Sequence, residues 1–189
     1  MIILIGLPKS GTSSFQHLFT QLGYRTYHWV KGKQYIGSMI KNNKSNNKPL
    51  LNDFLDTDVI TQMDICINEN NCYWPQIVDY KQILKENPGS IFILNKRNPE
   101  ELLDSFKRWG VGLHNRLYKY NPELIDDKTD KGFINFVNNF YKDIETYFTK
   151  DSNIKFISYD INNDKIEKLK KYIDIKNIKI LPRININKK

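Results

Sequence analysis

Apolar and polar residues along the chain form blocks whose lengths and periods predict β-strands separated by α-helices. Residues 1–5 (MIILI) are an unbroken apolar run. Such runs are typical of strands buried on both faces of a parallel sheet. Residues 88–110 are predicted to form a turn, a buried strand, a short connection and a helix that ends at a glycine. Apolar side chains recur at helical spacing over residues 74–87 and 132–148, which predicts two amphipathic helices.

The same patterning predicts the remaining elements. Further strands are expected at residues 24–30, 58–65 and 154–160, and further helices at residues 12–22, 33–41 and 164–173. Strands that alternate with helices indicate an α/β fold in which a parallel sheet is the middle of three layers. No repeat and no boundary divides the chain, so we interpret residues 1–189 as one domain.

Punctuating residues mark the expected ends of these elements. Gly23 is a predicted C-cap, and Asn98 is a predicted N-cap with Pro99 in the first helical position. Residues 41–48 (KNNKSNNK) are predicted to be a polar surface loop. Residues 111–130 lack strong periodicity and are predicted to form a long connection, which is a candidate substrate lid.

Composition narrows the class of protein. The chain has 189 residues, of which 40% are hydrophobic, enough to bury a sizeable core. Neither a signal peptide nor a membrane span is apparent, because the first apolar run is short and a glycine loop follows it. These features predict a soluble, intracellular (cytoplasmic) protein. The two cysteines, Cys66 and Cys72, are expected to be reduced and to hold no metal.

The net charge of +8, from 29 basic and 21 acidic residues, suits an anionic partner. This charge is compatible with three classes of partner: nucleic acid, an acidic sugar and a phosphorylated small molecule. The lysines are dispersed and no nucleic-acid-binding module is recognisable, so we expect no nucleic-acid partner.

The loop after the first strand, residues 6–14 (GLPKSGTSS), has the glycine spacing of a phosphate-binding P-loop. A kinase or ATPase places Lys directly after the second glycine. Here that position is Thr12, and Lys9 lies inside the loop instead. A strand, a glycine loop and a helix N-terminus still present backbone N–H groups to an anion. The loop therefore predicts phosphate binding with a displaced cation.

The motif PKSGTSS resembles the 5′-phosphosulfate loop of the sulfotransferases that use 3′-phosphoadenosine 5′-phosphosulfate (PAPS), in particular a compact, soluble branch. The resemblance implies a P-loop NTPase-like fold and a donor bound without metal. It also implies that Lys9 contacts the transferring sulfonate. The cofactor-binding loop residues that it implies are Pro8, Lys9, Ser10, Gly11, Thr12, Ser13 and Ser14.

Two further segments carry the resemblance. Sulfotransferases bind the 3′-phosphate with an Arg at a strand end and a Ser eight residues later. Arg97 and Ser105 have this spacing, within a stretch (PGSIFILNKRNPEELLDS) similar to that of the compact branch. Arg–phosphate bonds are among the stronger polar contacts. The tail at residues 181–189 resembles a segment that closes over the cofactor, and Arg183 stands there in place of a common His.

Sulfonate transfer to a hydroxyl needs a base that takes the acceptor's proton. His28, after the second predicted strand, is the first candidate because an ordinary imidazole has a pKa near 6.5. Asp64, after another strand, is the second. Candidates for an apolar acceptor site are Tyr73, Trp74, Phe106 and Trp109, although core positions suit most of them better.

The sequence thus predicts a PAPS-dependent sulfotransferase that acts on a small-molecule or carbohydrate hydroxyl, such as an alcohol, a phenol or a sugar. Two alternatives remain at this point. One is a magnesium-dependent P-loop kinase or ATPase, which Thr12 disfavours. The other is a non-catalytic nucleotide-binding protein.

Overall fold

A computed structural model describes residues 1–110, 112–175 and 177–184 of the chain. In chain order the elements are β1 (Ile2–Leu4), α1 (Thr12–Gln21), β2 (Thr26–His28), β3 (Val30–Lys31), β4 (Gln34–Tyr35), α2 (Ile36–Ser45), η1 (Asn52–Phe54), β5 (Val59–Gln62), β6 (Ile65–Asn68), β7 (Asn71–Tyr73), α3 (Pro75–Val78), α4 (Tyr80–Glu86), β8 (Ile91–Lys96), α5 (Pro99–Arg108), α6 (Leu113–Tyr120), η2 (Pro122–Leu124), α7 (Asp130–Phe148), β9 (Lys155–Asp160) and η3 (Ile166–Lys171).

The main sheet has the strand order β4-β3-β2-β5-β1-β8-β9. Strands β2, β5, β1, β8 and β9 are parallel, and the short strands β3 and β4 add an antiparallel edge. Strand β1 lies between β5 and β8, as its unbroken apolar sequence predicts. The predicted α/β fold with a central parallel sheet is confirmed.

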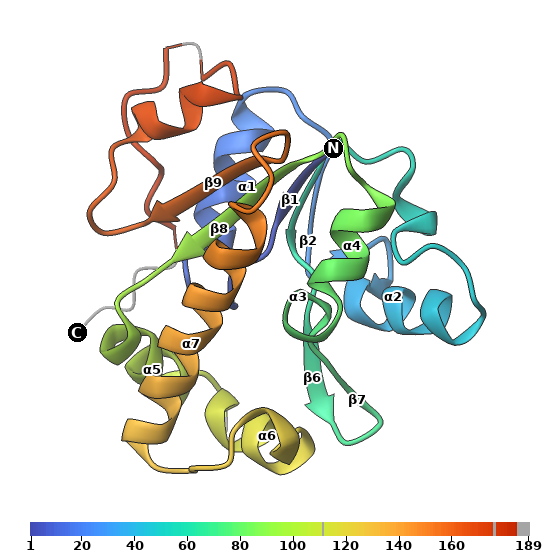
Figure 1. Ribbon diagram of the computed structural model, residues 1–189, viewed down its shortest axis with the longest axis vertical. Coiled ribbons are helices and arrows are strands. Elements are labelled where there is room, and N and C mark those ends of the chain that lie inside the picture. The colour runs from blue at the N-terminus through green and yellow to red at the C-terminus, as the bar shows by residue number, and fades with distance from the viewer. Residues whose placement is uncertain (111, 176, 185–189) are drawn as a thin grey trace.

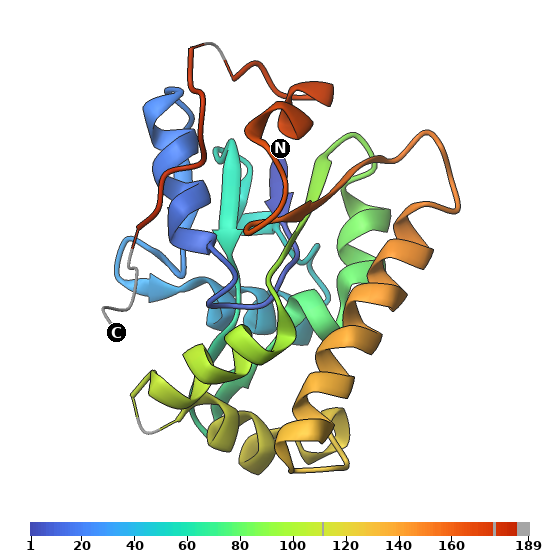
Figure 2. The same cartoon turned by 90° about the vertical axis from the view of Figure 1, so that its left-hand side faces the viewer.

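Two apolar cores lie on opposite faces of the sheet, and residues of β1 point alternately into them. Ile2 and Leu4 pack with the apolar side of α1, and Ile3 and Ile5 pack with the helices of the other face. Figure 2 shows α1 on one side of the sheet and α7 on the other. Helix and loop covers therefore bury the strands from both sides, and the carboxyl ends of the parallel strands open toward α5 and α6 (Figure 1).

Three predicted elements are interrupted in the structure. The strand expected at residues 24–30 is broken at Trp29, which adopts a φ of 62° and turns the chain into the edge hairpin β3–β4. The helix expected at residues 74–87 divides at Asp79 into α3 and α4. Tyr73 donates a hydrogen bond to the Asp79 carboxylate, which holds this break. The helix expected at residues 164–173 is the shorter 3₁₀ segment η3.

Two predicted loops are helical instead. Helix α2 runs through most of residues 41–48 because Asn43 is buried and donates to the carbonyl of Leu50 at 3.2 Å. Such a buried amide cannot be distinguished from a surface amide by composition. Residues 113–120 form α6, which packs against α5 and β6 through Leu113 and Leu117. The prediction of an irregular connection over residues 111–130 is therefore wrong; residue 111 lies outside the described residues.

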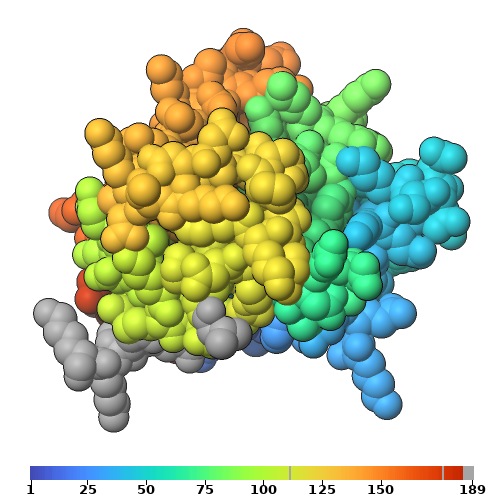
Figure 3. Space-filling model, turned by 90° about the horizontal axis from the view of Figure 1, so that it is seen from below, coloured from blue at the N-terminus to red at the C-terminus, as the bar shows by residue number. Residues whose placement is uncertain are grey.

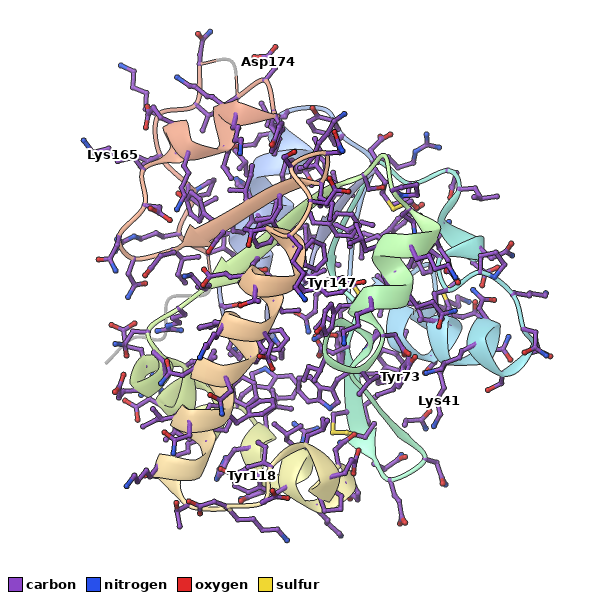
Figure 4. All side chains as sticks on the ribbon, in the orientation of Figure 1. Lys41, Tyr73, Tyr118, Tyr147, Lys165 and Asp174 are labelled. Atoms are coloured by element: carbon purple, nitrogen blue, oxygen red, sulfur yellow. A yellow bond between two sulfur atoms is a disulfide. The ribbon has the colours of Figure 1, made fainter. Side chains whose placement is uncertain are left out.

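The two cysteines form a disulfide across the hairpin β6–β7 (Figure 4), so the expectation that they are reduced is wrong. Cys66 stands directly opposite Cys72 in the antiparallel register of this hairpin. Paired positions on neighbouring strands bring their Cβ atoms within bridging distance. Figure 3 shows the same end of the molecule, where the hairpin (green) lies beside α6 (yellow).

Candidate functional site

A cavity of about 1180 Å³ lies at the carboxyl ends of the parallel strands. In doubly wound α/β sheets this edge is where ligands bind. Its lining includes eleven of the twelve residues that the sequence singles out, namely Pro8, Lys9, Gly11, Thr12, Ser13, Ser14, His28, Asp64, Arg97, Ser105 and Arg183. The structure thus brings together groups from both halves of the chain.

The phosphate-binding loop joins β1 to α1 and is held by Asn95 of β8. Its side-chain oxygen accepts from the backbone N–H of Gly6 at 3.1 Å, and its amide donates to the Ser10 carbonyl at 3.0 Å. A Cβ added at Gly6 would lie 2.2 Å from the Asn95 carbonyl oxygen. Only glycine fits at this contact.

Ser10 is the predicted site residue whose side chain does not reach the cavity. It is fully buried, and its hydroxyl donates to the carbonyl of Leu7. The residues that follow it differ, because Gly11 is the N-cap of α1, with a φ of 83°. The first N–H groups of a helix have no intrahelical acceptor. The loop therefore presents Gly11, Thr12, Ser13 and Ser14 to the cavity, as an anion site requires.

Arg97 and Ser105 line the same cavity as the loop. Arg97 follows β8, and its Nη1 donates to the carbonyl of Lys9 at 3.2 Å while its Nε donates to Glu101 at 3.2 Å. Ser105 lies on α5 and is 1% exposed. The predicted N-cap Asn98 begins α5 by accepting from the Glu101 N–H.

Lys9 adopts a φ of 67°, one of three positive values at non-glycine residues in the described part of the chain. Burial, together with the nearby Arg97 and Arg108, lowers its pKa from the ordinary value. Strained backbone of this kind costs about 1–3 kcal/mol and clusters at functional sites. The lysine is thus held beside two guanidinium groups that a bound anion would neutralise.

His28 is held in one tautomer by its neighbours. The Thr61 hydroxyl donates to the Tyr27 carbonyl at 3.3 Å, so it accepts from His28 Nδ1, which lies 3.0 Å away. This leaves Nε2 unprotonated, 3.4 Å from the Ser13 hydroxyl. Burial lowers the pKa of His28 to about 4. The imidazole is therefore neutral near pH 7 and a weak base.

The pKa of Asp64 is shifted in the opposite direction to that of His28. Its carboxylate accepts from the side-chain amides of Gln62 at 3.3 Å and Gln76 at 3.2 Å. It is 4% exposed, and burial raises its pKa to about 7 despite these hydrogen bonds. The usual order of the two pKa values, with histidine above aspartate, is therefore inverted at this site, because burial disfavours both charged forms.

Gln62 links this carboxylate to the phosphate loop and was missed in the sequence. Its side-chain oxygen accepts from the Thr12 hydroxyl at 3.0 Å, while its amide donates to Asp64. No signal in the sequence marks it, because the strand expected at residues 58–65 runs past Gln62, whereas β5 ends there beside β1.

The aromatic candidates separate into core and cavity. Trp74 and Phe106 are buried and stack with ring centroids 6.4 Å apart, away from the cavity. Trp109 lines the cavity, and so does Trp29, which was not among the aromatic candidates from the sequence. Their rings meet edge to face, with centroids 6.5 Å apart.

The tail approaches the cavity from the α1 side. Leu181, Pro182, Arg183 and Ile184 contribute to its lining. The N–H of Ile184 donates to the Ser14 hydroxyl at 3.2 Å, which ties this segment to the first turn of α1. The rest of the predicted basic tail, residues 185–189, lies outside the described residues.

No three His, Cys, Asp or Glu side chains among residues 1–110, 112–175 and 177–184 are grouped so that they would hold a metal ion. In the same part of the chain, no helix is both long enough and apolar enough to cross a membrane.

Comparison with known protein families gives one match. A family model described as a sulfotransferase domain matches residues 1–179, which is nearly the whole chain. No curated protein matches the sequence. The matched range includes every cavity residue described above except those of the tail.

Proposed function

The chain belongs to the sulfotransferase family, and we propose that it transfers the sulfonate group of PAPS to a hydroxyl acceptor. The observation that carries this proposal is the hydrogen bond from Arg97 to the Lys9 carbonyl, with Ser105 lining the same cavity. It joins the loop suited to a 5′-phosphosulfate to the two side chains suited to a 3′-phosphate. A cavity of about 1180 Å³ has room for a nucleotide and a small acceptor.

When bound, PAPS supplies an activated sulfonate, whose bond to the 5′-phosphate oxygen breaks as a new bond to the acceptor oxygen forms. The N–H groups at the start of α1 hold the 5′-phosphate. Arg97 and Ser105 hold the 3′-phosphate, and Arg183 adds a positive charge at the tail side of the cavity.

Lys9 acts on the charge that develops during transfer. Negative charge grows on the bridging oxygen as the sulfur–oxygen bond breaks, so a fixed cation there favours the transition state over the ground state. The positive φ of Lys9 and the bond from Arg97 to its carbonyl fix the backbone from which the ammonium group extends. This arrangement suits a preorganised cation.

Asp64 is the better general base of the two candidates. A base is most effective when its pKa lies near the working pH, and burial raises the pKa of Asp64 to about 7 while it lowers that of His28 to about 4. The two amides of Gln62 and Gln76 orient its carboxylate. His28, with Nε2 as an acceptor, orients the Ser13 hydroxyl of the phosphate loop.

The kinase alternative has less support. A P-loop kinase needs Lys after the second glycine and a Ser or Thr hydroxyl on magnesium. Here Thr12 occupies the lysine position, and its hydroxyl donates to a neutral amide, that of Gln62. The non-catalytic alternative differs from the proposal only in turnover.

Radiolabelled transfer tests the proposal directly. The chain is incubated with PAPS labelled in its sulfonate and with pools of phenols, sugars and aliphatic alcohols, without magnesium. We expect labelled product from at least one pool, and none from ATP labelled in its γ-phosphate when magnesium is supplied in that parallel incubation. Tight binding of adenosine 3′,5′-bisphosphate without any product in any pool would favour the non-catalytic alternative.

A further inference from the structure

Trp29 and Trp109 form two walls at one side of the cavity. Their rings stand at 85° to one another with centroids 6.5 Å apart, and both contribute to the same lining as Asp64. Trp109 keeps 38% of its surface exposed. A large aromatic side chain usually buries most of its surface, so an open aromatic corner beside a carboxylate is a candidate binding surface.

The backbone of Trp29 is strained, which is a second observation in favour of a binding role. Its φ of 62° places a bulky residue in the left-handed region that glycine prefers. Its N–H donates to the carbonyl of Gln62 at 3.0 Å, two residues before Asp64. Strain of this kind persists where the surroundings impose it, and it clusters at ligand sites.

Trp109 is fixed from the other side by Arg116 of α6. The guanidinium group lies 4.8 Å from the ring centroid, and its Nη1 donates to the carbonyl of Cys66 at 2.8 Å. Cys66 and Leu113 continue the same wall. The corner is therefore preformed, and a second cation lies over Trp109, since the Lys9 ammonium is 5.9 Å from the ring centroid.

We infer that the corner of Trp29 and Trp109 binds the acceptor, and that this acceptor is a planar phenol. The inference rests on the proposed function and names its substrate class. Two rings at right angles offer a flat ring both a face and an edge, the two arrangements that aromatic pairs prefer. Among the described carboxylates that line this cavity, Asp64 is the one with near-complete burial, and it accepts the proton of a single hydroxyl.

A sugar suits this corner less well. Each of its hydroxyls needs a partner once it leaves water. Among the nearby polar groups, Arg116 Nη1 donates to the Cys66 carbonyl, Gln62 bridges Thr12 and Asp64, and the Gln76 amide donates to Asp64. Two atoms of these side chains, Gln76 Oε1 and Arg116 Nε, have no hydrogen-bond partner among the described residues, but both are buried and belong to residues outside the cavity lining. A phenol brings one hydroxyl and an apolar ring, which matches what the corner leaves available.

Quenching of tryptophan fluorescence tests the inference without turnover. The chain, saturated with adenosine 3′,5′-bisphosphate, is titrated with 4-nitrophenol, which absorbs in the range of tryptophan emission. We expect saturable quenching that phenol reverses by competition. Cyclohexanol has the size of phenol but is not planar. Glucose has hydroxyl groups but no aromatic ring. Neither should displace the probe at the same concentration.

Two variants remove the corner and one serves as a matched control. Trp109→Ala and Trp29→Gly should each weaken 4-nitrophenol binding by about two- to twelvefold, which corresponds to the usual contribution of an aromatic pair. Glycine adopts a positive φ without strain, so Trp29→Gly removes the ring without a backbone penalty. Trp74→Phe alters a tryptophan that is 1% exposed and outside the cavity lining, and it should leave the dissociation constant unchanged.

The outcomes separate this inference from the proposed function. Binding that survives both Trp109→Ala and Trp29→Gly, displacement by cyclohexanol or glucose as readily as by phenol, or an absence of saturable binding would each overturn the phenol site. Calorimetry with adenosine 3′,5′-bisphosphate alone tests the donor. If that nucleotide does not bind, the donor assignment fails, and the dependence of 4-nitrophenol binding on Trp109, measured without nucleotide, still decides the inference.

Discussion

Arg97 Nη1 donates a hydrogen bond to the backbone carbonyl of Lys9 at 3.2 Å, joining residues that are 88 positions apart. Arg97 follows β8, and Lys9 follows β1, the neighbouring strand of the sheet. The bond places a guanidinium group against the loop from which the lysine extends. The side chain that suits the 3′-phosphate therefore also supports the residue that suits the sulfonate.

The first prediction concerns Arg97→Ala. Loss of one charge-assisted hydrogen bond costs about 1.5–3 kcal/mol, so adenosine 3′,5′-bisphosphate should bind about 10- to 100-fold more weakly. Adenosine 5′-monophosphate has no 3′-phosphate. Its affinity should therefore fall much less, by only the amount that the hydrogen bond from Arg97 to the Lys9 carbonyl contributes. Isothermal titration of both nucleotides without magnesium measures the difference.

Glu101→Gln is the matched control for this prediction. Glu101 accepts from Arg97 Nε at 3.2 Å and is exposed, so the substitution removes the ion pair and keeps the arginine. Its effect on both nucleotides should be small, because exposed ion pairs contribute about 0–1 kcal/mol. Equal weakening of both nucleotides by Arg97→Ala would contradict the assignment of the 3′-phosphate.

The second prediction concerns Lys9→Ala. Removal of a preorganised group that stabilises developing charge commonly lowers the rate about 10²- to 10³-fold. Binding of adenosine 3′,5′-bisphosphate, which has no sulfonate, should change far less. Saturating PAPS gives kcat, and calorimetry gives the nucleotide affinity. Lys9→Arg, which keeps the positive charge at the same strained position, is the control and should retain more activity than Lys9→Ala. Near-normal turnover of Lys9→Ala would be inconsistent with this role.

Much of the fold follows from the sequence because its strongest signals are local. The apolar runs of β1 and β8 and the cap at Asn98 each depend on a few neighbouring residues. The errors arise where distant contacts decide. A buried amide, that of Asn43, extends α2 through a polar stretch, and a strained Trp29 ends a strand that composition would continue.

The candidate site follows the same division. The loop and the spacing of Arg97 and Ser105 are visible as motifs, so these cavity residues could be named in advance, whereas Gln62 and Trp29 could not. The order of the two pKa values could not, because burial sets both and burial is a property of the folded chain. Pairing of the cysteines likewise depends on the register of the β6–β7 hairpin, and this register cannot be deduced from the number of cysteines in the sequence.

The third prediction concerns the acidic limb of the rate profile. If Asp64 is the base, kcat/KM should fall as the pH drops below about 7, because the folded carboxyl group then gains a proton. A His28 base would hold activity down to about pH 4, where its imidazole becomes charged. His28→Ala should therefore keep the limb near pH 7, and Asp64→Asn should lose about 10²- to 10⁴-fold in kcat.

Asp104→Asn controls for the loss of a carboxylate from the cavity. Asp104 lines the cavity but is exposed, and it forms only a long ion pair with Arg108. This variant should keep both the rate and the limb near pH 7. A limb that persists in a still active Asp64→Asn enzyme and vanishes in His28→Ala would transfer the role of base to His28.

The last prediction concerns stability rather than activity. The folded pKa of Asp64 is raised to about 7 from the model-compound value of 3.8, so the folded state holds this proton more tightly than the unfolded state. Stability attributable to the group is complete below pH 3.8 and is lost as the pH rises toward 7. Asp64→Asn has no proton to lose, and relative to wild type it should gain about 2–3 kcal/mol between pH 5 and pH 8. Urea unfolding of both proteins at these two pH values measures this gain, and Asp104→Asn, whose carboxylate is exposed, should show almost none. Parallel pH dependence of wild type and Asp64→Asn would mean that the carboxylate is ordinary in the folded chain and poorly matched to proton transfer near neutral pH.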